Sequence, residues 1–140
     1  MMRRPDGFTL IELLFVLVVF VILLAIAVPA YNAYVTSARR SEGRNALMAL
    51  LHTQENLRSV CPQYASSLGA TTDCTAGQLA AVTTTENGYY LIAITAASDT
   101  GFTATATAQG QQQQRDKDCP QLSLAMTAGN LVLTPPSCWK

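Results

Sequence analysis

Charge is scarce in this sequence. Only 13% of its 140 residues are Asp, Glu, Lys or Arg, and nine basic residues cancel nine acidic ones. A nucleic-acid-binding domain usually carries a basic excess, so this balance weighs against nucleic acid as a partner. The sequence also has one histidine, His52, with no second histidine or acid at ligand spacing, so we expect no metal site there.

The residue constellations that enzymes need are also missing. We find no nucleophile with a base, no carboxylates paired for a cleft and no metal cluster. The acids come closest to clustering at Asp116 and Asp118, on either side of Lys117. Two carboxylates fall short of the roughly six to eight oxygens that calcium prefers, so calcium there is only a minor alternative. The sequence predicts a protein without enzymatic activity and without a cofactor.

One long stretch, from Leu13 to Tyr31, has no charged side chain at all. About 20 apolar residues of helix match the roughly 30 Å hydrocarbon core of a bilayer. Arg3 and Arg4 precede the stretch, and basic residues mark the cytoplasmic flank of a membrane helix. We therefore expect a single-pass membrane helix over residues 8–31, with the rest of the chain facing outward.

A lone acid, Glu12, stands near one end of this apolar segment. A charged side chain costs about 2.5 to 3.5 kcal/mol at the centre of a membrane helix and less near the interface. An acid retained there usually has a partner or a role. The alternative is that its carboxylate reaches the interfacial water.

The residues GFTLIEL follow a short basic leader and precede AIAVPAY, and this pattern resembles the prepilin signature of type IV pilins and related pseudopilins. Gly7, Phe8, Glu12 and Pro29 match the motif, and the short leader is similar to that of the type IVa class. The resemblance implies that residues 1–7 are a leader peptide. A prepilin peptidase would cut between Gly7 and Phe8 and methylate the new amino terminus at Phe8.

The same resemblance implies assembly roles for Glu12 and Pro29. The family's glutamate pairs with the terminal amine of a neighbouring subunit, while the apolar helices pack together in the filament core. Many members carry a glycine in mid-helix where this chain has Val21. Any unwinding would then depend on Pro29 and its β-branched neighbours. The resemblance also implies that the subunit starts in the inner membrane, with its C-terminal domain in the periplasm. The implied partners are other pilins, the prepilin peptidase, the pilus assembly machinery in the inner membrane and, before assembly, membrane lipid.

An ordinary signal peptide is the alternative, because Ala25-Ile26-Ala27 has the small-x-small form of a signal-peptidase site. Cleavage there would release a soluble domain that begins at Val28. However, the apolar run exceeds the usual 7 to 15 or so residues and contains Glu12, so we favour the prepilin interpretation.

Residues 32–59 predict a continuation of the helix, since they contain no proline and only one glycine, Gly43. Apolar residues recur there at helical spacing and predict one buried face. These residues are Val35, Ala38, Ala46, Leu47, Leu50 and Leu57. Cys61-Pro62 should end the helix, and a loop to about Thr85 should follow.

Four short strands are expected after that loop, at residues 89–96, 101–108, 121–126 and 130–133. The run Gln111–Gln114 between them is expected to be a loop without a function. A sheet with one apolar face needs a cover, which the helix provides. The predicted fold is α+β and pilin-like, with a long N-terminal helix packed on a four-stranded antiparallel sheet and residues 32–140 forming a globular periplasmic domain.

Four cysteines suit an oxidising compartment, and three pairings are possible. The tail from Arg115 resembles the disulfide-closed end of PilE-like minor pilins, which often finish in a Cys-Trp pair. We expect the bonds Cys61–Cys74 and Cys119–Cys138, each of which closes a short loop.

Together these resemblances imply a minor pilin, a structural subunit of an extracellular type IV pilus that serves adhesion, twitching motility or DNA uptake. One alternative is a type II secretion pseudopilin, although the four cysteines and the Cys-Trp end count against it. Another is a DNA-binding receptor pilin, for which the cluster Arg39, Arg40 and Arg44 is the only hint. We expect these arginines to form a solvated face or to pair between subunits.

Overall fold

The computed structural model describes residues 8–140, so the predicted leader, with Gly7 of the expected cleavage site, lies outside the described residues. The elements are α1 (Leu10–Arg58), β1 (Ser67–Gly69), β2 (Gln78–Ala80), β3 (Tyr90–Ala97), β4 (Gly101–Ala108), α2 (Gly110–Arg115), β5 (Gln121–Thr127), β6 (Asn130–Thr134) and the 3-10 turn η1 (Pro136–Trp139). The contacts divide the chain into two units, of which the first ends at Val35 and the second begins at Thr36.

The helix α1 has clear start and stop signals. At its start the backbone N–H of Glu12 donates to Thr9 Oγ1 over 3.3 Å, so Thr9 satisfies one of the free N–H groups of the first turn. At its end the N–H of Cys61 donates to the carbonyl of Leu57 over 2.8 Å, and Pro62 cannot continue the helical bonding. The helix ends at Arg58, close to the predicted boundary.

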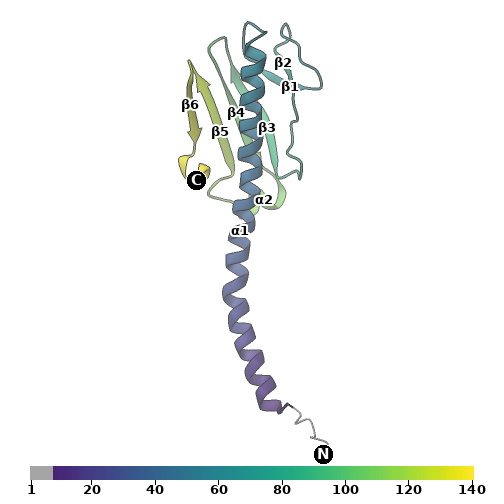
Figure 1. The fold of residues 1–140 in the computed structure, drawn as a ribbon, viewed down its shortest axis with the longest axis vertical. Coiled ribbons are helices and arrows are strands. Elements are labelled where there is room, and N and C mark those ends of the chain that lie inside the picture. Colours follow the sequence, from purple (N-terminus) through teal and green to yellow (C-terminus); the bar gives the residue numbers. More distant parts are fainter. Residues whose placement is uncertain (1–7) are drawn as a thin grey trace, which may run out of the picture. The chain divides into compact units, whose positions relative to one another are not determined.

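In the second unit, α1 lies across one face of a four-stranded sheet of order β3-β4-β5-β6 (Figure 1). Each neighbouring pair of strands is antiparallel. The hairpin between β5 and β6 turns at Ala128 and Gly129, which both have positive φ, the backbone conformation of a tight two-residue turn. The predicted helix-on-sheet fold is confirmed.

The core lies between α1 and the sheet. Alternate residues of β4, namely Phe102, Ala104, Ala106 and Ala108, are at most 2% exposed, as their pattern predicts. The small side chains let α1 approach the sheet closely, and Gly43 marks one contact, because a Cβ there would come within 2.9 Å of Tyr90 Cγ. Leu47, Leu50 and Leu57 fill the core as expected, whereas Ala38 is exposed.

Two parts of the secondary structure differ from the prediction. The expected loop after α1 contains β1 and β2, which pair in parallel over three residues. The glutamine run expected to be a loop forms α2 instead. Glutamine is a good helix former, and α2 is further held by tertiary bonds of its buried Gln112.

Two disulfides close the second unit. They join Cys61 to Cys74 and Cys119 to Cys138, with Cα–Cα separations of 5.4 Å and 5.8 Å. These are the pairs that the sequence favoured. The first ties the end of α1 to the loop that follows it, and the second ties η1 to the segment that precedes β5.

Candidate functional site

The first candidate site is the apolar surface of α1 before Val35. An 18-residue window there has a mean hydropathy of 3.3, and none of it is buried. The first buried residue of α1 is Gly43, in the second unit. A continuous apolar surface of this size is not stable against water and marks an interaction with membrane or protein. By length and composition this part of α1 can cross a membrane.

The predicted methylation residue Phe8 and the predicted assembly residue Glu12 lie close together around the start of α1. Phe8, which is 86% exposed, and Glu12 line the same hollow of about 190 Å³, together with Leu13 and Val16. Glu12 lies in the first turn, where the positive end of the helix dipole favours an anionic side chain. The arrangement places a carboxylate four residues from the expected mature terminus.

Pro29, the other predicted assembly residue, lies inside α1. It has no N–H to give to the carbonyl one turn earlier, so the helix lacks one backbone bond there. The helix nevertheless continues to Arg58. In this structure, therefore, Pro29 is a locally weakened point in an unbroken helix.

The second candidate site is the set of basic side chains in the second unit. Arg40 forms a two-bond ion pair with Asp116, including Nε to Oδ2 over 2.9 Å. The guanidinium of Arg39 lies 4.6 Å from the centre of the Tyr89 ring, within cation–π range. These two arginines are bound within their own chain, so the expectation of a solvated or intersubunit cluster is wrong for them. The reason is that Asp116, directly after α2, and Tyr89, directly before β3, are partners that sequence spacing does not reveal.

A buried polar network joins this ion pair to α2. Gln112 is fully buried, and its Nε2 lies 3.1 Å from the carbonyl of Thr36, 3.2 Å from Tyr90 Oη and 3.0 Å from Asp116 Oδ2. Burial raises the pKa of Tyr90, so its hydroxyl stays protonated. The hydrogen bond to Asp116 raises the pKa of Arg40, which keeps its charge. Buried polar groups bonded in this way fix the position of α2 against α1.

This network was not predicted from the sequence. Gln112 looked like any other member of a low-complexity run, and its one available signal is the four-residue spacing to Asp116, which puts both side chains on the same side. Gln54 was missed in the same way. It is buried and exchanges two 2.9 Å hydrogen bonds with the backbone of Ala65.

Two family models match the sequence. One is described as a prokaryotic N-terminal methylation motif and matches residues 2–28. The other is described as type IV minor pilin ComP, DNA uptake sequence receptor, and matches residues 29–123, more than half of the chain. The chain belongs to the type IV minor pilin ComP family. The pilin recognised from the sequence motifs is thereby confirmed.

This pilin is also similar to the type IV major fimbrial protein FimA of Dichelobacter nodosus, with 34% identity over 93 residues. The match covers 64% of this chain and 58% of the length of FimA. Pilins are structural, not enzymatic, and a type IV pilin assembles with other pilins in a pilus. The apolar helix together with the family indicates a membrane-anchored protein of the pilus.

The minor alternative of a calcium site in this pilin is not supported by the structure. Asp116 is 3% exposed and its carboxylate is occupied by Arg40 and Gln112. Among residues 8–140 no group of three or more His, Cys, Asp or Glu side chains is placed to hold a metal ion. His52 is exposed on α1, as an isolated surface residue would be.

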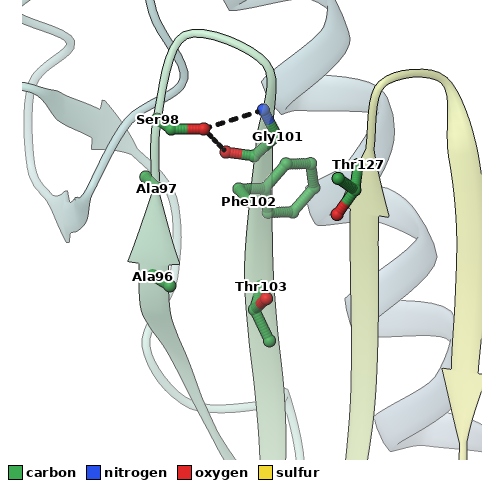
Figure 2. Close-up of a pocket in the computed structure, with 7 residues that line it drawn as sticks. All are labelled: Ala96, Ala97, Ser98, Gly101, Phe102, Thr103 and Thr127. Carbon is green, nitrogen blue, oxygen red and sulfur yellow. Dashed lines mark hydrogen bonds between the residues drawn. The ribbon is translucent and has the colours of Figure 1, made fainter.

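The head of the pilin also has a small hollow of about 170 Å³ beside the turn between β3 and β4 (Figure 2). Ser98 Oγ forms the turn, because it accepts from the N–H of Gly101 and donates to the Gly101 carbonyl, both over 3.1 Å. Ala96, Ala97, Phe102, Thr103 and Thr127 complete the lining. The seven lining residues include no ionisable side chain, so they offer hydroxyls and apolar surface but no acid–base chemistry.

Proposed function

We propose that this chain is a DNA-binding receptor carried on a type IV pilus, into which it is built as a minor subunit. The observation that carries the DNA role is the family match over residues 29–123, whose description names a DNA uptake sequence receptor. The balanced overall charge argues against a broadly basic surface, so DNA must bind through a few local cations. The charge balance alone argues against nucleic acid as a partner, and the family match is the reason for proposing DNA as the ligand here.

We also propose how the subunit matures. A prepilin peptidase cuts between Gly7 and Phe8 and methylates Phe8, which agrees with the match of residues 2–28 to a methylation motif. Arg3 and Arg4 keep the leader cytoplasmic, so residues 32–140 enter the periplasm and later reach the outside of the cell. Two disulfides suit that oxidising route.

Assembly then depends on the exposed apolar part of α1 and on Glu12. Lipid covers this surface in the membrane, and the helices of other pilins cover it in the filament. The Glu12 carboxylate pairs with the methylated amine of a neighbour's Phe8, and this pairing is supported by the exposure of both residues on the subunit. The pilus assembly machinery moves the subunit from one environment to the other.

Maturation is tested by mass spectrometry of the protein extracted from membranes. The expected amino terminus is Phe8 carrying one methyl group. A terminus at Val28 would establish the signal-peptide alternative instead. Immunogold labelling of sheared filaments then locates the subunit, and label confined to a secretion apparatus would favour a pseudopilin.

The DNA role is tested with the full chain in nonionic detergent and a labelled DNA duplex. Binding should weaken as salt rises, because phosphate contacts release counterions. A strain without the gene should lose DNA uptake while keeping its pili, and the wild-type gene should restore uptake. Uptake that persists in the deletion strain would refute the receptor role while leaving the pilin assignment intact.

A further inference from the structure

The cations of the second unit are confined to a few places. No Lys, Arg or His lies between Arg58 and Arg115, and none lies between Lys117 and Lys140. The four strands β3 to β6 contain no charged residue of either sign. The sheet and the long loop before it therefore cannot neutralise a phosphate backbone.

Most arginines of this unit already have partners within the chain. Arg40 pairs with Asp116, and Arg39 stacks on Tyr89. Arg58 donates to the carbonyls of Asp99 and Cys61 over 3.2 Å and 3.1 Å. These three arginines are engaged in contacts that hold the fold together, and Arg44 is partly buried. The fully exposed cations are therefore better placed to bind phosphate.

Arg115 is the last residue of α2, and Lys117 follows it by two residues. Both are exposed, and within residues 8–140 neither makes a side-chain hydrogen bond or an ion pair. The acid between them, Asp116, is turned inward and neutralised by Arg40. Of the neighbouring acids only the exposed Asp118 opposes them. Asp118 can offset at most one of the two positive charges, so the two flanking cations face solvent with a net positive charge.

The element that carries these cations is held rigidly, because Gln112 and Asp116 anchor α2 to Thr36, Tyr90 and Arg40. The other three glutamines of α2, Gln111, Gln113 and Gln114, are exposed. A glutamine amide can both donate and accept, and it recognises adenine through two hydrogen bonds in the major groove. One short helix thus presents amides beside two free cations.

We propose that duplex DNA contacts this pilin along α2. Arg115 and Lys117 bind phosphates, and the exposed amides of Gln111, Gln113 and Gln114 reach the base edges. The proposal rests on the DNA role proposed above and gives that role a location. Since only two phosphates are contacted, binding by one subunit is weak and falls with salt at a log–log slope of about −2.

The test measures fluorescence anisotropy of a labelled random-sequence duplex with the full chain in nonionic detergent, at about 50 to 200 mM salt. The variants are the double change R115Q/K117Q, the single change K117Q and the matched control K140Q, which removes the other exposed lysine. We expect the double variant to lose roughly tenfold or more in affinity at low salt, and K117Q to reduce the slope by about 1. K140Q should bind as the wild type does.

A second variant set tests the amides. Q111A/Q113A/Q114A should keep the salt slope but narrow the difference in affinity between A·T-rich and G·C-rich duplexes. If the triple variant keeps the wild-type preference between the two duplexes, the glutamine amides do not contact the bases. Circular dichroism checks that every variant keeps its fold, and Arg40, Gln112 and Asp116 stay intact in all of them.

The outcomes separate this placement from the function on which it rests. If the wild type binds DNA and R115Q/K117Q binds as tightly as K140Q does, the DNA role stands and its location on α2 is wrong. If the wild type fails to bind any duplex at low salt, both the DNA role and its location on α2 are refuted. Loss in R115Q/K117Q with retention in K140Q supports both.

Discussion

The helix α1 contributes to both units of the chain. Its apolar side chains before Val35 are exposed, whereas most apolar side chains after Thr36 are buried or partly buried within the second unit. Among residues 8–35 no side chain is buried, so the described part of the first unit has no core of its own. The second has a core between α1 and the sheet and is closed by two disulfides. The first unit must therefore obtain its stabilising contacts from lipid or from other subunits, while the second obtains them from its own sequence.

Two acids show the same difference. Asp116 is buried and has an arginine partner from its own chain. The Glu12 carboxylate is exposed and has no partner among residues 8–140. Substitution of Asp116 should therefore affect folding, and substitution of Glu12 should affect assembly. The following predictions test this division, from the largest expected effect to the smallest.

Reduction of both disulfides should have the largest effect, and only on the second unit. Each bond closes a short loop, with sequence separations of 13 and 19, and contributes about 3 kcal/mol by loop-closure entropy. A total of about 6 kcal/mol is comparable to the whole stability of a small domain. Amide hydrogen exchange in detergent should show lost protection in β3 to β6 and retained protection in α1 before Val35. Equal loss in both units would mean that they fold as one.

Asp116→Ala should destabilise the second unit by about 3 kcal/mol, because it leaves the half-buried Arg40 without its counter-charge. It also removes an acceptor from Gln112. The measurement is the free energy of unfolding in urea. Asp118→Ala is the matched control, since that acid is exposed, and it should change stability by less than about 0.5 kcal/mol. Equal effects of the two changes would show that the ion pair does not hold α2.

Glu12→Ala should leave membrane insertion and processing intact but impair entry into the filament. The substitution removes the free-energy cost of inserting a charged side chain, so the monomer should insert into the membrane at least as well as the wild type. In the filament a neighbour's amine would be buried without a counter-charge. A net loss of about 2 kcal/mol lowers incorporation about thirtyfold.

The measurement compares the processed membrane pool with the sheared-filament fraction. Glu86→Ala is the control, because it removes an exposed carboxylate from the second unit. Wild-type amounts of the Glu12 variant in both fractions would mean that Glu12 only contacts interfacial water.

Sequence reasoning succeeded where the signal is local. The alternation of β4, the turn at Ala128-Gly129 and Pro62 after the helix each act through neighbouring residues, and the elements they predict are present. It failed where the partner is distant in sequence. Arg40 and Asp116 are 76 residues apart, and nothing in the spacing of either reveals the other. The burial of Gln112 depends on the same distant contacts.

Glu42→Gln should have the smallest effect, and it should depend on pH. Glu42 accepts from the backbone N–H of Asn87 over 3.1 Å and from its side-chain amide over 2.8 Å. Partial burial raises the pKa of Glu42, but these bonds and one from Thr85 outweigh it, so the pKa lies below its ordinary value of 4.5. A lowered pKa in the folded state stabilises the fold above the unfolded value, and this stability is lost as pH falls through the folded pKa.

The wild type should therefore lose stability relative to the Gln variant as the solution is acidified from about pH 5 to about pH 3, by less than about 1 kcal/mol because the carboxylate is partly exposed. Urea unfolding of both proteins across this range measures the difference. Glu86→Gln, at the neighbouring turn, should follow the wild type at every pH, since Glu86 is exposed and makes no such bonds within residues 8–140. A constant difference between wild type and Glu42→Gln over the range would show that the charge on Glu42 does not help to fix this turn against α1.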